Sequence, residues 1–99
     1  MKSLSLKNLQ HKIAHHRDQQ AYKDLFFLFY QPLFRFALGF VKEKFAADEV
    51  VSDVMTKIWT LENRLGQIDN LTVYMYRATR NQSLNYIRNN RKHAAQSLD

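Results

Sequence analysis

Apolar side chains recur at helical spacing along most of the chain, and no segment alternates with a period of two. The pattern predicts a short first helix within residues 4–16 and a second helix that begins at Asp18, a good N-cap residue. The second helix continues to Val41, and we expect a kink or break near Pro32 because proline has no amide hydrogen to donate. Residues 22–45 hold most of the aromatic side chains and are therefore expected to form the core.

Two further helices are predicted in the second half of the chain. Residues 46–61 place apolar side chains on one half of a helical wheel, and we expect Trp59, at the edge of that half, to belong to the core. A loop over residues 62–69 follows, and Asn70 can cap a last helix over residues 71–92. The fold class predicted by these patterns is all-α, a compact bundle of four to five helices.

The length of 99 residues predicts one domain with a core of its own. We expect a short N-terminal helix in residues 1–17, the main helical body in residues 18–92 and a frayed tail in residues 93–99. The apolar run over residues 25–41 is interrupted by polar side chains and is shorter than a span of ~20 residues. We therefore expect no membrane insertion. The N-terminus also lacks the apolar core of a signal peptide, so a cytoplasmic protein is predicted.

The net charge of the chain is +6, from 15 Lys and Arg residues against 9 Asp and Glu residues, which favours an anionic partner. The charge is unevenly spread, because residues 46–62 are acidic and both flanks are basic. A surface that serves only solubility would mix the two signs. The sequence therefore predicts two surfaces of opposite charge, suited to a basic protein on one side and nucleic acid on the other.

The last predicted helix carries several arginines and, between Asn70 and Leu98, no acidic residue. Phosphates bind closely spaced positive charges, and amide and guanidinium groups can read base edges. Asn81 and Asn85 lie among these arginines, so the helix is a candidate nucleic-acid surface. An ordinary solvated helix with buried tyrosines explains the composition equally well, and both interpretations stay open at this point.

We find no nucleophile motif, glycine-rich phosphate loop or carboxylate pair suited to acid–base catalysis, so an enzyme is not expected. The chain has no cysteine, which excludes disulfides and thiolate metal sites. His11 and His15 stand four residues apart, a spacing that two zinc ligands can use, but no third ligand is placed with them. We predict no cofactor and a basic surface here. A metal-binding bundle or an enzyme that uses the two histidines stays as an alternative.

The chain from Tyr22 to Lys92 resembles region 2 of bacterial RNA polymerase sigma factors of the sigma-70 family, in particular the extracytoplasmic-function (ECF) class. Three segments carry the resemblance, in order and at family-like spacing. They are the aromatic tract that begins Ala21-Tyr22 and ends Phe36-Ala37, the acidic helix Ala47-Asp-Glu-Val-Val-Ser-Asp-Val-Met-Thr-Lys-Ile-Trp59, and Tyr74-Met-Tyr-Arg-Ala-Thr-Arg-Asn81. Tyr74 stands where the family usually has Trp, and Ser52 where Gln is common.

The resemblance implies a transcription initiation factor domain that binds core RNA polymerase and that recognises and helps to melt the promoter −10 element. It implies docking on the clamp coiled coil of the polymerase β′ subunit through Asp48, Glu49, Ser52, Asp53 and Thr56. It implies DNA binding by Asn63, Arg64, Leu65, Arg77, Arg80, Asn81, Asn85 and Arg88. An anti-sigma factor is a further implied partner, and the −35-binding domain of the family is absent from this chain.

The alternative function is a stand-alone helical nucleic-acid-binding module without polymerase contact, which would leave Glu49 and Asp53 without a task. We expect the isolated domain to bind weakly and to prefer single-stranded −10-like DNA to duplex, because unstacking a base from duplex DNA costs a few kcal/mol. The expected pocket lies between the loop of residues 62–69 and the start of the last helix.

Overall fold

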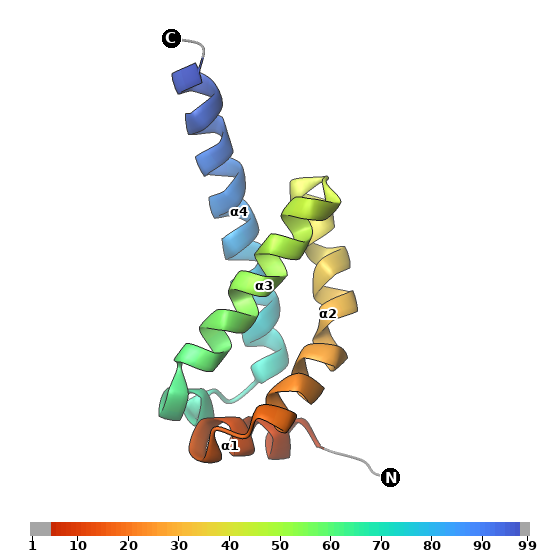
Figure 1. The fold of residues 1–99 in the computed structure, drawn as a ribbon, viewed down its shortest axis with the longest axis vertical. Helices are drawn as coiled ribbons and strands as arrows, with labels where there is room; N and C mark the ends of the chain where they lie inside the picture. Colours follow the sequence, from red (N-terminus) through yellow and green to blue (C-terminus); the bar gives the residue numbers. More distant parts are fainter. Residues whose placement is uncertain (1–4, 98–99) are drawn as a thin grey trace.

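In a computed structural model, residues 5–97 form five helices joined by short connections, and side chains are described for residues 5–91 (Figure 1). The elements are α1 (Leu6–His16), α2 (Gln19–Val41), α3 (Lys44–Thr60), the 3-10 helix η1 (Glu62–Gln67) and α4 (Leu71–Ser97). No strand occurs within residues 5–97. The predicted all-α bundle is therefore confirmed.

The long helices α2, α3 and α4 pack against one another, and α1 crosses the end of the bundle where η1 lies (Figure 1). The core runs through the middle of this group, with Leu33 from α2, Val51 from α3 and Met75 from α4 completely or almost completely buried. Leu9 and Ile13 of α1 close the core at the η1 end. Because each helix buries one stripe of apolar side chains, the opposite stripes of α3 and α4 are left to solvent.

Three side chains begin helices by accepting the amide hydrogens that the first turn leaves unpaired. Asp18 accepts from the amide of Ala21 at 3.1 Å, and Asn70 accepts from the amide of Val73 at 3.1 Å. Both N-caps were predicted from the sequence and are confirmed. Ser5 performs the same role for α1.

The helix α2 continues without interruption through Pro32, so the predicted break there is wrong. Pro32 is exposed, whereas Phe29 and Leu33 beside it are buried. The hydrogen bond that proline cannot make would have reached the carbonyl of Leu28, whose side chain is 55% exposed. Water can bond that carbonyl, and the buried neighbours hold the helix in place on both sides.

The element boundaries differ from the prediction at three places. α3 begins at Lys44, two residues before the predicted start, and residues 62–67 are 3-10 helix rather than loop. α4 continues past Lys92 to Ser97. The predicted frayed tail covered residues 93–99, but residues 93–97 belong to α4. Residues 98–99 lie outside the described part of the structure.

Among the described helices, α2 is long and apolar enough to cross a membrane by length and composition, with a mean hydropathy of 1.3. It packs against α1, α3 and α4, and Leu25, Leu33 and Ala37 are fully buried in those contacts. These side chains belong to the core, whereas Phe27 and Leu28 of the same helix are 80% and 55% exposed.

Candidate functional site

The exposed side of α3 gathers five side chains that we call the acidic face: Asp48, Glu49, Ser52, Asp53 and Thr56. They repeat at three- and four-residue intervals, so they lie on one side of the helix. The other side of α3 enters the core with Val50, Val51, Val54, Met55 and Ile58. The structure therefore brings together all five residues predicted for protein contact.

Neighbouring helices hold two carboxylates of the acidic face. Tyr30 of α2 donates its hydroxyl hydrogen to Asp48 across 2.5 Å, and Gln82 of α4 donates to Asp53 across 3.1 Å. Tyr30 also stacks between Phe26 and Phe34, with ring centroids 5.4 and 5.7 Å apart. The hydrogen bond to Asp48, followed by burial and the carboxylate charge, raises the pKa of Tyr30 above its ordinary value of 10.0.

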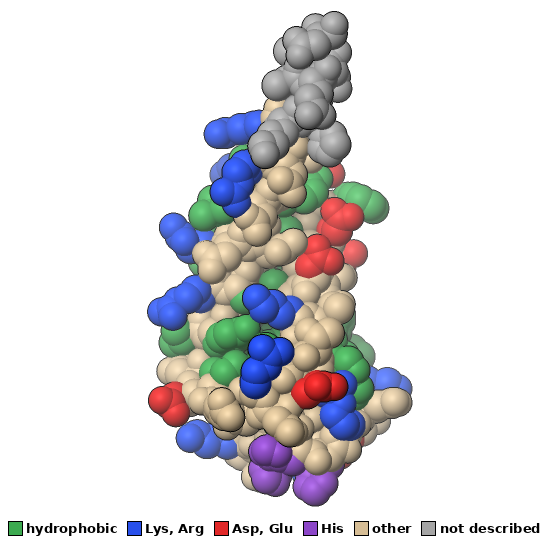
Figure 2. Space-filling view, turned by 90° about the vertical axis from the view of Figure 1, so that its left-hand side faces the viewer, with side chains coloured by type: hydrophobic (Ala, Val, Ile, Leu, Met, Phe, Trp, Pro, Cys, Tyr) green, Lys and Arg blue, Asp and Glu red, His purple; other side chains and the backbone are tan. Residues whose placement is uncertain are grey.

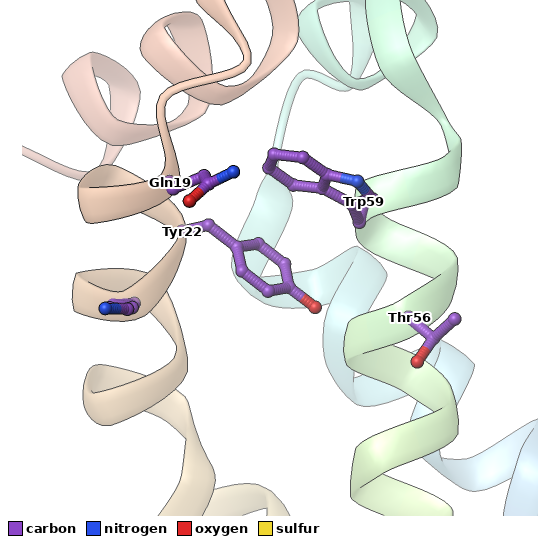
Figure 3. A pocket seen from close by; sticks show the side chains of 5 residues that line it. Gln19, Tyr22, Thr56 and Trp59 are labelled. Carbon is purple, nitrogen blue, oxygen red and sulfur yellow. The ribbon is translucent and has the colours of Figure 1, made fainter.

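A cleft of about 450 Å³ lies beside Thr56 at the C-terminal end of the acidic face (Figure 3). It is lined by Gln19, Tyr22, Lys23, Thr56 and Trp59. Trp59 packs against the edge of the core and is half-buried, not inside the core as predicted. Tyr22 meets Trp59 edge to face at 5.0 Å and donates its hydroxyl hydrogen to the carbonyl of Met55 across 2.6 Å.

Arg17 explains why Trp59 stays at the edge of the core. Its guanidinium lies over the indole ring, 3.8 Å from the centroid, and also donates to the Trp59 carbonyl across 2.8 Å. A cation over an aromatic face is attracted by the ring, and the contact keeps the charged group beside solvent. No sequence pattern connects Arg17 to a residue 42 positions away.

The exposed side of α4 carries five of the residues predicted for DNA contact, which we call the basic face: Arg77, Arg80, Asn81, Asn85 and Arg88. Two shallow hollows of about 500 and 350 Å³ run along it and meet at Asn81. Val73 and Leu84 add apolar surface to these hollows, with 47% and 38% of their areas exposed. The basic face therefore combines cations, amides and apolar surface along one side of one helix.

The two faces carry opposite charge on adjacent helices. α3 packs against α4, and the hydrogen bond between Gln82 and Asp53 joins them at their exposed sides. In the upper part of Figure 2, Lys and Arg side chains lie along the left and acidic side chains cluster at the right, whereas charged side chains of both signs are mixed lower down. The predicted separation of charge is therefore present on the folded molecule.

The other three residues predicted for DNA contact belong to η1, and they differ in exposure. Asn63 and Arg64 are exposed, but Leu65 is completely buried. Leu65 fills the core at the α1 end, so its side chain cannot contact DNA in this fold, and the sequence-based assignment of Leu65 is corrected. An apolar residue inside a polar segment is the signal that points to burial.

The hollow beside the η1 segment faces α1, not the start of α4 as expected. It is lined by Lys7, Gln10, His11, His15, Gly66, Ile68 and Asp69. Gln10 is buried there and bonds to the η1 segment, a role that sequence reasoning missed. Its position between Leu9 and Ile13, on the buried side of α1, was the available signal, because a buried amide needs partners.

The three histidines of α1 lie near one another, with ring centroids 4.8 Å apart for His11 and His15 and 5.5 Å apart for His11 and His16. Within the described residues, no group of three or more His, Asp or Glu side chains is placed to hold a metal ion. The metal-binding alternative thus gains no third ligand from the part of the chain that the structure describes.

Comparison with protein-family models matches residues 25–93 to sigma-70 region 2. No curated protein and no solved structure matches the chain. The matched segment contains the acidic face, η1 and the basic face, whereas α1 lies before it. Sigma-70 region 2 is a non-enzymatic transcription initiation domain that, in general, binds RNA polymerase and recognises promoter −10 elements. With most of its residues inside the match, and with the all-α fold already described, the chain belongs to the sigma-70 region 2 family.

Proposed function

We propose that this domain docks on the clamp coiled coil of the polymerase β′ subunit through the acidic face and binds the promoter −10 element through the basic face and η1. The observation that carries the proposal is the placement of two exposed faces of opposite charge on the adjacent helices α3 and α4. The proposal assigns the chain to the ECF class, acting in the cytoplasm under the control of an anti-sigma factor. The resemblance of the three sequence segments supports this finer assignment.

The acidic face suits a basic helical partner. Glu49 and Asp53 are exposed and stand one turn apart, so both can meet cations on one partner helix. Exposed ion pairs contribute only ~0.2–1 kcal/mol each, but they orient the partner and raise the association rate. The cleft beside Thr56 offers apolar surface next to these charges. Charge and apolar contact together suit a specific protein interface.

The basic face suits a melted DNA strand. Arg77, Arg80 and Arg88 are exposed on this face. Contacts from them to phosphates would supply affinity that falls as salt rises. The amides of Asn81 and Asn85 face solvent among them and can bond to base edges. An unpaired base that stacks on an exposed aromatic ring gains ~1–3 kcal/mol. Exposed apolar surface can also contact unpaired bases.

The polymerase contact is tested by reversing the charge of Glu49 and Asp53 together. We expect Glu49→Lys/Asp53→Lys to weaken binding to a β′ clamp coiled-coil fragment by roughly tenfold or more, because two exposed pairs become two repulsions. Glu62→Lys/Asp69→Lys is the matched control, since it makes the same charge change at exposed sites outside the acidic face. Equal weakening by both double variants would contradict docking through this face.

The DNA contact is tested by fluorescence anisotropy with single-stranded and duplex −10-like oligonucleotides at two salt concentrations. We expect tighter binding to the single strand. Arg88→Ala should weaken binding to every sequence and reduce the salt dependence, whereas Asn81→Ala should reduce the preference between sequences. Equal affinity for both DNA forms, with an unchanged preference in Asn81→Ala, would leave a nonspecific basic helix.

The same experiments separate the alternative function. A stand-alone nucleic-acid-binding module would bind DNA but would show no affinity for the β′ fragment before or after the charge reversal. Binding of the wild-type chain to that fragment therefore decides between the two functions.

A further inference from the structure

The amide of Gln10 joins α1 to the segment that connects α3 with α4. Its Nε2 atom donates to the carbonyl of Leu65 across 2.7 Å and to the carbonyl of Ile68 across 2.8 Å. A side-chain amide nitrogen carries two hydrogens, so both are used. Gln10 is only 6% exposed, and water therefore has little access to replace these bonds. The two carbonyls stand at the C-terminal end of η1 and just after it.

Two other contacts tie the same segment to α1. The Leu65 side chain is completely buried in the cluster that contains Leu9 and Ile13. His15 lies directly over Gly66, where an added Cβ would come within 2.8 Å of the His15 Nε2 atom. No side chain larger than hydrogen fits there without displacing the imidazole. The sequence thus supplies a glycine where the His15 side chain of α1 lies against the η1 backbone.

The segment η1 has little to hold it in place by itself. It is a single 3-10 helix of six residues, a geometry with weaker hydrogen bonds than an α-helix. It also begins at Glu62, whose positive φ of 54° is unfavourable for a side chain with a Cβ. The position of the exposed Asn63 and Arg64 therefore depends on the contacts that α1 makes with Leu65, Gly66 and Ile68.

We propose that Gln10 is a positioning residue for promoter recognition: it fixes η1 in the orientation that presents Asn63 and Arg64 to the DNA strand, without touching the DNA. The inference rests on the proposed function of η1. It assigns a task in sequence preference to α1, which lies before the segment matched to the family. If η1 opens, the fraction of molecules able to read the strand falls, and the apparent affinity for the preferred sequence falls with it.

Two substitutions of Gln10 remove the donors while keeping the length of the side chain. Gln10→Met has no donor, and Gln10→Glu places a carboxylate against two carbonyl oxygens. Gln31→Met and Gln31→Glu are matched controls, because Gln31 is exposed on α2 outside both faces. All variants of the 99-residue chain are measured under conditions where circular dichroism shows them to be folded.

The first measurement is hydrogen exchange of the Arg64 and Ile68 amides, which bond to the carbonyls of Leu61 and Leu65. Loss of the buried donor should increase exchange at these amides by roughly tenfold or more in the Gln10 variants, and not in the Gln31 variants. Core amides of α3 should keep their exchange rates, because global unfolding is not involved.

The second measurement is the ratio of affinities for two single strands, one selected from a random library by the wild-type chain and one with the same bases scrambled. We expect the ratio to fall by about threefold or more in the Gln10 variants, because the binding-competent fraction falls. The salt dependence should be unchanged, since Arg77, Arg80 and Arg88 still reach the phosphates. A purely structural role for Gln10 would leave the ratio unchanged.

The outcomes separate this inference from the proposed function. Unchanged amide exchange, or faster exchange with an unchanged ratio, overturns the role of Gln10 and leaves the proposed function in place. If the wild-type chain selects no strand, both the proposed function and the role of Gln10 in sequence preference are overturned. The exchange data would still show whether Gln10 stabilises η1. If Gln10→Glu does not fold, Gln10→Met alone decides.

Discussion

The hydroxyl of Tyr30 and the carboxylate of Asp48 lie 2.5 Å apart and join the aromatic side of α2 to the acidic face of α3. Asp48 is thus held by a neighbouring helix, whereas Glu49, the next residue, projects freely from the exposed side of α3. The two adjacent acids therefore differ in their freedom to follow a partner. A hydrogen bond to a charged group is stronger than one between neutral groups, but exposure to water reduces its net value.

We expect Tyr30→Phe to lower the free energy of unfolding by about 0.5–1 kcal/mol near neutral pH, because the substitution removes this partly exposed bond and little else. Urea titration followed by the fluorescence of the single tryptophan measures the change. Tyr76→Phe is the control, since no side-chain hydrogen bond of Tyr76 contributes to the acidic face. If both variants lose the same free energy of unfolding, the Tyr30–Asp48 hydrogen bond does not contribute to stability.

The same bond predicts a dependence of stability on alkaline pH. The pKa of Tyr30 is raised by the hydrogen bond to Asp48, and burial raises the pKa of Tyr22. A tyrosine whose folded pKa lies above its unfolded value of 10.0 contributes stability that is fully present below pH 10 and is lost as pH rises through the folded pKa. Wild-type stability should fall above about pH 10, and Tyr30→Phe should fall less. Parallel pH curves would contradict the assignment.

Trp59→Ala should cost about 2 kcal/mol, below the ~3–5 kcal/mol typical of a fully buried aromatic residue, because Trp59 is only half-buried. Arg17→Met tests the contact above the ring and should cost about 0.5–2 kcal/mol, since it removes both the cation and the donor to the Trp59 carbonyl. Thermal unfolding followed by circular dichroism gives both values. A loss above ~3 kcal/mol for Trp59→Ala would place the indole inside the core after all.

Ser83 and Thr79 lie one turn apart on α4, and both are completely buried. The Thr79 hydroxyl donates to the Met75 carbonyl across 2.7 Å, whereas the Ser83 hydroxyl has no hydrogen-bond partner among the described residues. Ser83→Ala should therefore raise the free energy of unfolding by about 1 kcal/mol, because it removes an unpaired buried hydroxyl. Thr79→Val should leave the free energy of unfolding unchanged within ~0.5 kcal/mol, or lower it, but should not raise it. Destabilisation by Ser83→Ala would indicate that its hydroxyl has a partner.

Lys42 ends α2 with a positive φ of 65°, and its amide donates to the Leu38 carbonyl across 2.9 Å. Glycine adopts this conformation without the steric cost of a Cβ. Lys42→Gly should therefore be more stable than Lys42→Ala by about 0.5–1 kcal/mol in urea titrations. The alanine variant removes the same charge and controls for electrostatics, so equal stability of the two variants would exclude backbone strain at this position.

The number and type of helices were predictable because they depend on local features. The apolar spacing along α3 and the capping side chains of Asp18 and Asn70 act over a few residues, and the structure confirms them. Pro32 misled the prediction because the cost of a proline depends on which side of the helix its missing bond faces. That side is set by the packing of α2 against other helices, which a local pattern does not contain.

The candidate site was predictable where it lies on one helix and less so where distant segments meet. The acidic and basic faces each follow from the periodicity of a single element. Leu65 was assigned to DNA contact because the resemblance covers its position, although its apolar side chain in a polar segment indicates burial, and its packing in the core cluster with Leu9 and Ile13 of α1 shows that it is buried. Gln10 and Arg17 act on residues 55 and 42 positions away, and neither pairing leaves a periodic signal in the sequence.

The packing of α1 against η1 also affects the order in which the helices can form their contacts during folding. Residues 55 positions apart must meet before Gln10 finds its two carbonyls, so closing this contact carries a larger loss of chain entropy than pairing α2 with its sequence neighbour α3. We expect α2 and α3 to form the folding nucleus and α1 to dock last. A φ-value near zero at Ile13 and clearly higher values at Val51 would show this order. During synthesis, α1 would then leave the ribosome before α2 and α3 but dock after they have paired.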